Sequence, residues 1–144
     1  MEKHFDLPVS FQNKYTPFFI RKEDNNILVL SDIHVPYHSN EAIKTAFLYG
    51  IKNKVNTILL NGDILDFYKL SRFTTDPLKI DFANEILLGR QFFMSLRKTF
   101  PKCSIYYKIG NHEERLEAYL KMKAPELWGV PTFDYENMLP ILLS

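Results

Sequence analysis

Three short apolar runs that alternate with helical segments constrain the fold of this chain most strongly. The runs are rich in Ile, Leu and Tyr, which favour β-strands, and they cover residues 27–30, 57–60 and 104–109. Apolar residues recur at helical spacing over about residues 41–52, 81–99 and 113–122. Strands and helices in this order form right-handed βαβ units around a parallel sheet. We therefore predict an α/β fold, with the first strand buried on both faces.

An aromatic-rich arm, residues 1–26, precedes the first predicted strand. It carries five aromatic side chains, Phe5, Phe11, Tyr15, Phe18 and Phe19. An arm this apolar is expected to pack on the body of the protein rather than to lie free in solvent. The whole chain has 144 residues, a length typical of one domain.

Composition excludes several classes of protein. A formal net charge of +1 disfavours a strongly basic nucleic-acid-binding module. Cys103 is the only cysteine, which excludes an intrachain disulfide and a cysteine-based zinc site. The sequence has no apolar run of the roughly 18 residues that a membrane span needs, and no signal peptide at its start. We therefore expect a cytoplasmic protein without a membrane partner.

A polar cluster follows each predicted strand directly. The clusters are Asp32-x-His34, Gly62-Asp63-x-x-Asp66 and Gly110-Asn111-His112-Glu113. Since ligands bind at the carboxyl ends of parallel strands, the three clusters should converge at one edge of the sheet. Carboxylate, imidazole and amide ligands suit Mn, Fe, Zn, Ni or Mg, and a central carboxylate can bridge two metals about 3.5–4 Å apart.

Each cluster also has a simpler interpretation when it is taken alone. Asp-x-His and Gly-Asp are ordinary polar turns, and Asn111-His112 can cap the third helix, with Glu113 in its first turn. Gly62 and Gly110 end their strands, where glycine permits a positive φ or a close backbone approach. The order and placement of all three clusters favour a divalent metal site.

At these clusters the sequence resembles the calcineurin-like metallophosphoesterase superfamily. The pattern of that family is Asp-x-His, Gly-Asp-x-x-Asp and Gly-Asn-His-Asp/Glu, and then a lone His and Gly-His-x-His. The flanking residues are similar to the phage and bacterial branch of the family, and the resemblance covers about residues 27–144. It implies an αββα sandwich, of which this chain contains the N-terminal βαβαβ half with a mostly parallel sheet. We expect residues 1–144 to be a single, truncated domain of this type.

The resemblance also implies roles for the residues of the clusters. Asp32 and His34 would hold a first metal, and Asp63 would bridge it to a second one. Asn111 would hold the second metal and touch the phosphate, while His112 would protonate the leaving group or stabilise charge near it. A metal-bridging hydroxide would attack phosphorus in line. The implied residues are catalytic His112, Asn111 and Asp63, metal-binding Asp32, His34, Asp63 and Asn111, and ligand-orienting Asp66 and Glu113.

The last two family blocks are absent, because no histidine follows His112. His4 and His38 do not fit the missing positions by order or context. The family uses two divalent metals, and we expect this chain to hold one, or to be partly occupied, since three protein ligands can hold a metal and two seldom do. The apolar stretch Leu139–Leu143 resembles an interior segment rather than a solvated end.

Two functions from different classes follow. The first is hydrolysis of a phosphomonoester or phosphodiester, with nucleic acid among the candidate substrates. The second is a catalytically impaired fragment that acts as a metal-binding or self-associating module. The partners expected are a phosphorylated substrate and either a second copy of the chain or a missing C-terminal half. Arg72 and Arg115 can contact phosphate, or they can be solvated loop and helix charges.

Overall fold

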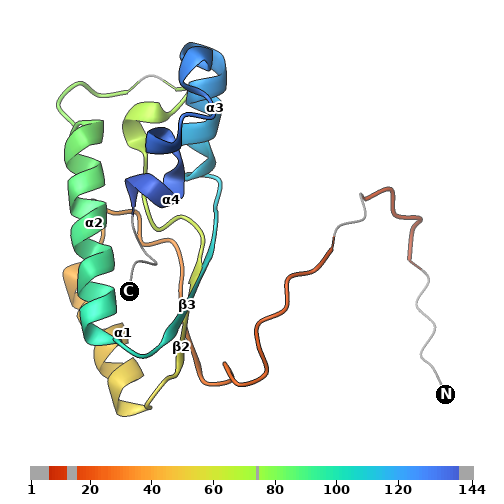
Figure 1. Ribbon diagram of the computed structural model, residues 1–144, viewed down its shortest axis with the longest axis vertical. Helices are drawn as coiled ribbons and strands as arrows, with labels where there is room; N and C mark the ends of the chain where they lie inside the picture. The colour runs from red at the N-terminus through yellow and green to blue at the C-terminus, as the bar shows by residue number, and fades with distance from the viewer. Residues whose placement is uncertain (1–6, 13–15, 74, 140–144) are drawn as a thin grey trace.

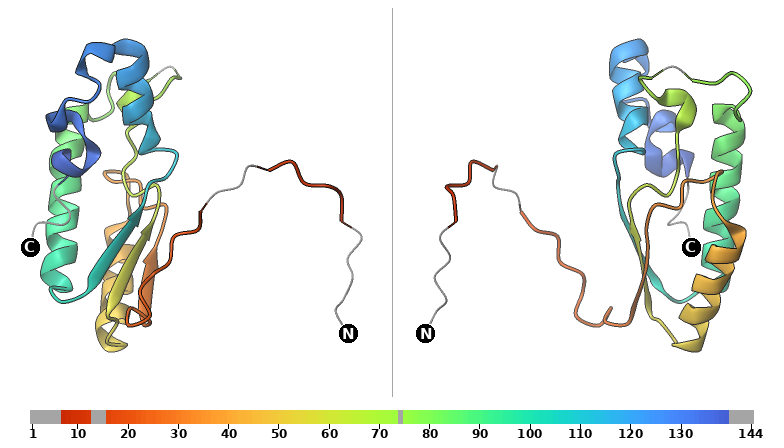
Figure 2. Two further views of the ribbon diagram at one scale, coloured as in Figure 1. Left: turned by 45° about the vertical axis from the view of Figure 1, so that its right-hand side comes forward. Right: turned by 180° about the vertical axis from the view of Figure 1, so that it is seen from behind.

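The computed structural model describes residues 7–12, 16–73 and 75–139. Its three strands are β1 (Ile27–Leu30), β2 (Thr57–Asn61) and β3 (Ser104–Lys108), which form one parallel sheet in the order β1-β2-β3. Ile27 lies opposite Thr57, which lies opposite Ser104. The crossover helices α1 (Asn40–Lys52) and α2 (Phe82–Thr99) lie on the same face of the sheet (Figures 1 and 2). The α/β class and the parallel half-fold are confirmed.

Both crossover helices begin at a side-chain cap. The Ser39 hydroxyl accepts from the Ala42 N–H at 3.3 Å, and the Asp81 carboxylate accepts from the Asn84 N–H at 2.8 Å. Such caps satisfy backbone donors that the first turn of a helix leaves free. The remaining elements are η1 (Tyr68–Leu70), α3 (Glu114–Lys123), η2 (Pro125–Leu127), η3 (Pro131–Phe133) and α4 (Tyr135–Met138).

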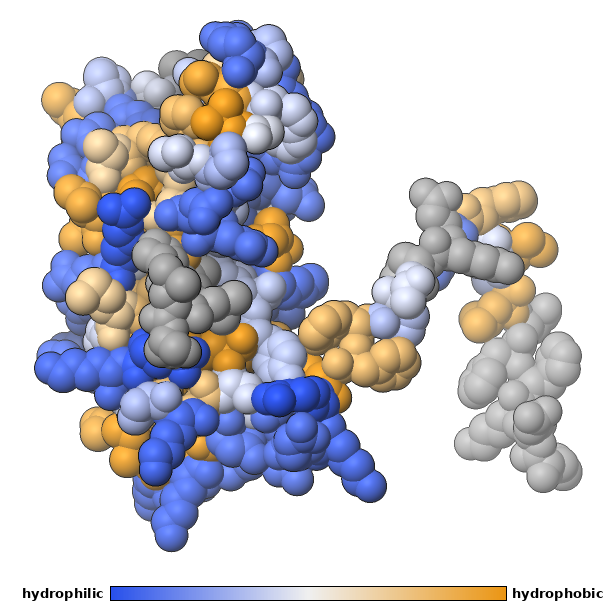
Figure 3. Space-filling view, in the orientation of Figure 1, coloured by the Kyte–Doolittle hydropathy of each residue, from blue (hydrophilic) through white to orange (hydrophobic). Residues whose placement is uncertain are grey.

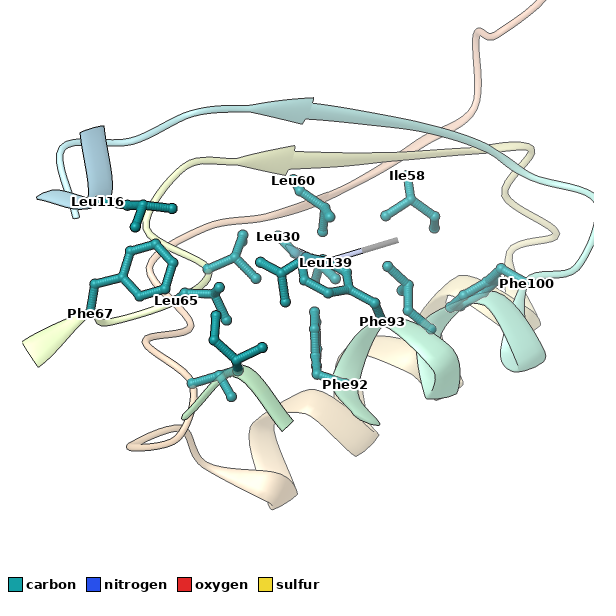
Figure 4. Packing of buried hydrophobic residues seen from close by; sticks show 14 of the residues in the cluster. Leu30, Ile58, Leu60, Leu65, Phe67, Phe92, Phe93, Phe100, Leu116 and Leu139 are labelled. Carbon is teal, nitrogen blue, oxygen red and sulfur yellow. The ribbon is translucent and has the colours of Figure 1, made fainter. Parts of the chain in front are cut away.

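The hydrophobic core lies between the sheet and helices α1 and α2 (Figure 4). Ile58 and Leu60 of β2 point from the sheet toward Phe93 of α2, and both side chains are fully buried. Burial of one such side chain stabilises a fold by about 1.5–3 kcal/mol. Leu139 is 1% exposed in the same core, which agrees with the interior character expected there. The other residues of that apolar stretch, 140–143, lie outside the described residues.

No helix of the described residues covers the second face of the sheet, which we call the open face. Val29 on this face is 54% exposed, so the prediction that the first strand is buried on both faces is wrong. The physical reason is the strand order, because two right-handed crossovers that advance in the same direction place both helices on one side.

The prediction that the arm packs on the body is also wrong for the residues that the structure describes. Five apolar side chains there are between 77% and 93% exposed, and Figures 1 and 3 show the arm leading away from the body. These residues are Leu7, Val9, Phe11, Phe18 and Phe19. Phe18 alone meets a body ring, that of Tyr106, with 5.8 Å between centroids. Phe5 and Tyr15 lie outside the described residues.

Hydrogen bonds join the last residues of the arm, Arg21 to Asn26, to the body. The buried Asp24 accepts from Arg21 Nε at 2.9 Å, from Ser104 Oγ at 2.9 Å and from Tyr106 Oη at 2.5 Å. This network fixes the start of β1 against β3, and just before it Phe18 and Ile20 line a shallow groove with residues of β2 and β3. Within the described residues, none of the helices has the length and apolar character that crossing a bilayer requires.

Candidate metal centre

The first two polar clusters meet just beyond the carboxyl ends of β1 and β2, where backbone pairing continues past the strands. The Asp32 N–H donates to Gly62 O at 3.2 Å, and the His34 N–H donates to Asp63 O at 3.0 Å. Val35 and Leu65 then form a further parallel bridge. This pairing holds the two loops side by side, as the convergence predicted from the sequence requires.

Three side chains from the three clusters form the candidate metal centre. One ligand atom each of His34, Asp63 and His112 lies within 4.8 Å of the others, and all three residues are half-buried. The rings of His34 and His112 meet edge to face, with 4.5 Å between their centroids. Imidazole nitrogen together with carboxylate oxygen is a donor set that borderline divalent ions prefer, so these residues fit such an ion.

Left-handed backbone conformations concentrate at this centre. Asp32, His34 and Asp63 have φ values of 54°, 55° and 53°, a region that non-glycine residues seldom adopt. Each such residue costs about 1–3 kcal/mol, and such costs are found mostly at binding and catalytic sites. The contacts around the loops must therefore hold this backbone in place.

Two glycines make the close approach of the loops feasible. Gly62 has a φ of +82°, and a β-carbon there would lie 3.0 Å from Gly110 Cα. A β-carbon on Gly110 would overlap the Asp63 backbone and carboxylate, and would lie 2.8 Å from Glu113 Oε2. The prediction that these two positions need glycine is confirmed.

The carboxylate of Glu113 organises the loop after β2. This residue is 2% exposed. Its Oε2 accepts from the N–H groups of Asp63 at 2.9 Å and Gly110 at 2.8 Å. Its Oε1 accepts from those of Ile64 at 2.6 Å and Leu65 at 3.0 Å. Tyr107 Oη adds a fifth hydrogen bond, to Oε1 at 2.8 Å. Glu113 thus fixes the backbone on both sides of Asp63 without reaching the centre itself.

His112 is held by three neighbours. Its N–H donates to Asp63 Oδ1 at 3.0 Å, and its Nδ1 lies 2.8 Å from the carbonyl oxygen of Asp66. Because a carbonyl can only accept, Nδ1 carries the ring proton and Nε2 is left as the acceptor. Arg115 Nη2 lies 3.2 Å from that Nε2, and its Nη1 donates to the same Asp66 carbonyl at 3.0 Å.

The Asp66 side chain faces both histidines. Its carboxylate oxygens lie 3.7 Å from His34 Nδ1 and 3.7 Å from His112 Nδ1. The same carboxylate lies 3.7 Å from Arg115 Nη1. A carboxylate behind the imidazole nitrogens fixes ring orientation, which is the role of outer partners in metal sites. Asp66 therefore lies beside both imidazole rings, and its role in orienting ligands stays a prediction.

A comparison with known protein families identifies the family to which the chain belongs. The family model of the calcineurin-like phosphoesterases matches residues 26–143, which include all three clusters. The chain belongs to the calcineurin-like phosphoesterase family. Curated proteins and solved structures gave no match. The resemblance seen at the sequence motifs is confirmed, and membership implies a metal-dependent hydrolase of phosphate esters.

Two of the four implied metal ligands of the phosphoesterase, Asp32 and Asn111, lie outside the group of three. Asp32 is exposed, and its carboxylate accepts a short hydrogen bond from Ser31 Oγ. Asn111 is exposed in the turn before α3. Their assignment as metal ligands stays a prediction, as do the catalytic roles of Asp63, Asn111 and His112.

The other arginine and histidine side chains considered from the sequence lie in different surroundings. Arg115 is half-buried at His112 and is not a solvated helix charge, whereas Arg72 is exposed and stacks over Phe73 at 5.1 Å. His38 pairs with Asn40 at 3.1 Å and, together with residues of α1 and α2, lines a groove. His4 lies outside the described residues.

Sequence reasoning missed two side chains that contact the loop after β2, the half-buried Tyr107 and the fully buried Glu85. Burial raises the pKa of Tyr107 far above its ordinary value, so the phenol stays protonated and donates to Glu113. Burial also raises the pKa of Glu85 to about 7, against about 4.5 for a solvated glutamate. An alternating position in β3 was the one available signal for Tyr107, since inward-facing residues alternate along a strand.

Proposed function

We propose that this chain is a metal-dependent phosphoesterase that hydrolyses a phosphomonoester or a phosphodiester. The observation that carries the proposal is the group of three ligand atoms, from His34, Asp63 and His112, within 4.8 Å of one another in a chain of this family. Asp63 lies centrally, since its carboxylate accepts from His112 while its carbonyl accepts from His34. His34 and Asp63 would hold a divalent ion, with Asp32 and Asn111 as the further ligands we predict.

A divalent ion at this centre supplies Lewis-acid charge to a phosphoryl oxygen and a lowered pKa to bound water. The chain contributes the groups that bind and orient the ester. Arg115 carries a fixed positive charge beside His112 Nε2, which disfavours a second cation there and favours a phosphoryl oxygen. His112 Nε2 would first take up a proton from water and then deliver it to the leaving oxygen, while Nδ1 stays bonded to Asp66.

The first test measures metal binding and hydrolysis together. Purified protein should bind about one Mn²⁺ or Zn²⁺ tightly per chain, measured by elemental analysis after gel filtration. Hydrolysis of bis-p-nitrophenyl phosphate and of p-nitrophenyl phosphate should require the metal, and comparison of the two distinguishes a diester from a monoester substrate. Two tightly bound ions per chain would contradict the single-site proposal.

Matched variants locate the activity at the centre. Asp63→Asn should abolish both tight metal binding and hydrolysis, because an amide cannot supply the anionic oxygen. Glu117→Gln is the control, since Glu117 is an exposed carboxylate that pairs with Lys121 at 2.5 Å on α3. Activity that survives Asp63→Asn would show that hydrolysis occurs elsewhere or comes from a contaminant.

Separately from hydrolysis, we propose that the chain self-associates through the open face of the sheet. Val29 is 54% exposed on that face, and Phe18 of the arm, which is 79% exposed, lies beside it against Tyr106. Exposed apolar patches of this kind favour association. Analytical ultracentrifugation should show an oligomer that Val29→Lys weakens and that Leu48→Lys, at an exposed leucine on α1, leaves intact. A monomer at all concentrations would refute this proposal.

A further inference from the structure

Glu85 in α2 is a buried carboxylate that no motif contains and that the proposed reaction does not use. Its side chain is fully buried, one oxygen accepts a short hydrogen bond from the Phe67 N–H, and no described residue bonds to the other oxygen, Oε2. Burial of a carboxylate with so few donors costs free energy that α2 could have avoided with an apolar residue. The contact with Phe67 is therefore the feature that needs an explanation.

That contact reaches the candidate centre through a single peptide unit. The Phe67 N–H and the Asp66 carbonyl belong to the same peptide group, so its nitrogen faces Glu85 and its oxygen faces His112. The oxygen accepts from His112 Nδ1 at 2.8 Å and from Arg115 Nη1 at 3.0 Å. A hydrogen-bonded series therefore runs from the Glu85 carboxylate, through one peptide, to the imidazole of His112.

The backbone at this peptide would not keep its geometry unaided. Phe67 has a φ of 51°, which is unfavourable for a large side chain. Its ring is fully buried and lies 5.7 Å from the Phe82 ring and 6.1 Å from the Tyr135 ring. The ring packing holds the side chain, whereas Glu85 holds the N–H, and together they set the direction of the Asp66 carbonyl.

We propose that Glu85 is a positioning residue that acts through the 66–67 peptide to keep the ring proton of His112 on Nδ1. A negative or polarised acceptor on the N–H makes the carbonyl at the other end of a peptide a stronger acceptor. The stronger carbonyl favours the Nδ1–H tautomer, which leaves the Nε2 lone pair directed at Arg115 and the centre. This inference rests on the proposed function for its consequence in catalysis, but not for the tautomer itself.

The experiment measures the His112 tautomer in metal-free protein by ¹⁵N–¹H correlation NMR at alkaline pH, where imidazole is neutral. His112→Gln identifies the signals among the four histidines. Wild type should show predominantly Nδ1–H. Glu85→Leu should raise the ratio of the Nε2–H to the Nδ1–H form about fivefold, which is the loss expected from one weakened hydrogen bond. Because neither metal nor substrate is present, the result does not depend on whether the chain hydrolyses phosphate esters.

Phe92→Leu is the matched control, because Phe92 is buried in the same helix about two turns beyond Glu85. It should lower the melting temperature and leave the tautomer unchanged. An unchanged tautomer in Glu85→Leu, with a melting temperature lowered as in the control, would show that Glu85 is only structural and would overturn the inference.

Glu85→Gln decides the question if the leucine variant does not fold. The neutral amide can still accept from the Phe67 N–H but polarises the peptide less. We expect the Phe67 amide proton resonance to move upfield and the Nε2–H fraction of His112 to rise. A Phe67 resonance and a tautomer ratio that both match wild type would overturn the proposal.

Discussion

Two buried glutamates accept hydrogen bonds from the same loop, and they differ greatly in how many they accept. Glu113, beside α3, accepts five hydrogen bonds, four of them from backbone N–H groups. Glu85, in α2, accepts one, from Phe67, and is just as deeply buried. Both carboxylates act on the backbone between Asp63 and Phe67, which is the segment that carries the candidate site.

The difference shows how the chain divides two tasks. Glu113 accepts hydrogen bonds from nearly all the otherwise unpaired N–H groups around Asp63. It therefore does most to hold the conformation of a loop whose backbone has unfavourable φ angles. Glu85 has one bond at the far end of the loop, where it sets the direction of a single peptide. The first carboxylate should therefore control whether the site forms, and the second how finely it is adjusted.

The largest expected effect comes from removal of Glu113. Glu113→Leu leaves four backbone N–H groups without an acceptor, two of them buried and two partly buried, at about 1–3 kcal/mol for each buried group. The sum reaches the lower end of the stability of an ordinary domain, about 5–15 kcal/mol, so we expect the variant to be unfolded. Circular dichroism and urea denaturation measure this. Glu114→Leu, at the exposed neighbouring glutamate, is the control and should unfold like wild type.

Folded Glu113→Leu protein with near wild-type stability would contradict the comparison. The hydrogen bonds of Glu113 would then be replaceable by water, and the loop would have to be held by the pairing of Val35 with Leu65 instead. Metal binding by that variant would exclude Glu113 as the organiser of the candidate site.

The next effect is the pH dependence that Glu85 imposes on stability. Burial raises its pKa from about 4.5 to about 7, so the folded state binds a proton that the unfolded state has already released between these values. The free energy of unfolding should therefore fall as the pH rises from about 4.5 to about 7, by about 3 kcal/mol from this group. The contribution is complete below pH 4.5 and lost above pH 7.

Urea denaturation at several pH values tests this slope. Glu85→Gln has no proton to release and should flatten the profile over that range. Asp66 and Arg115 also face Glu85, and they remain in the variant, so they serve as the internal reference. Parallel profiles for wild type and Glu85→Gln would show that the Glu85 carboxyl titrates alike in the folded and unfolded states.

The two glutamates also mark how far sequence reasoning reaches. The three strands, the three helices and the convergence of the clusters follow from local patterns, namely apolar runs, helical spacing and polar residues at strand ends. Glu113 lies inside a motif and was expected to orient ligands. Glu85 belongs to no motif, and an acidic residue in a helix ordinarily faces solvent. Its burial could not be predicted because it depends on the tertiary packing of α2.

Errors elsewhere have a similar origin. Apolar character in the arm indicated that its side chains would be buried, but it did not specify a surface to receive them, and Phe11 is 93% exposed. Val29 lies in a continuous apolar run, yet the common side of the two crossover helices leaves it uncovered. Periodicity predicts elements, whereas the layer that covers a given face depends on the whole topology.

The smallest expected effect comes from removal of one of the five hydrogen bonds to Glu113. Tyr107→Phe removes one of its five donors and leaves the four backbone N–H groups bonded, so stability should fall by only about 1–2 kcal/mol. Tyr106→Phe is the control, since that hydroxyl donates to Asp24, away from the loop. Hydrogen exchange should quicken at the Ile64 and Leu65 amides in Tyr107→Phe alone, because both donate to the Oε1 atom that loses its phenol. Equal exchange in the two variants would mean that the backbone bonds hold the carboxylate unaided and that Tyr107 adds only packing.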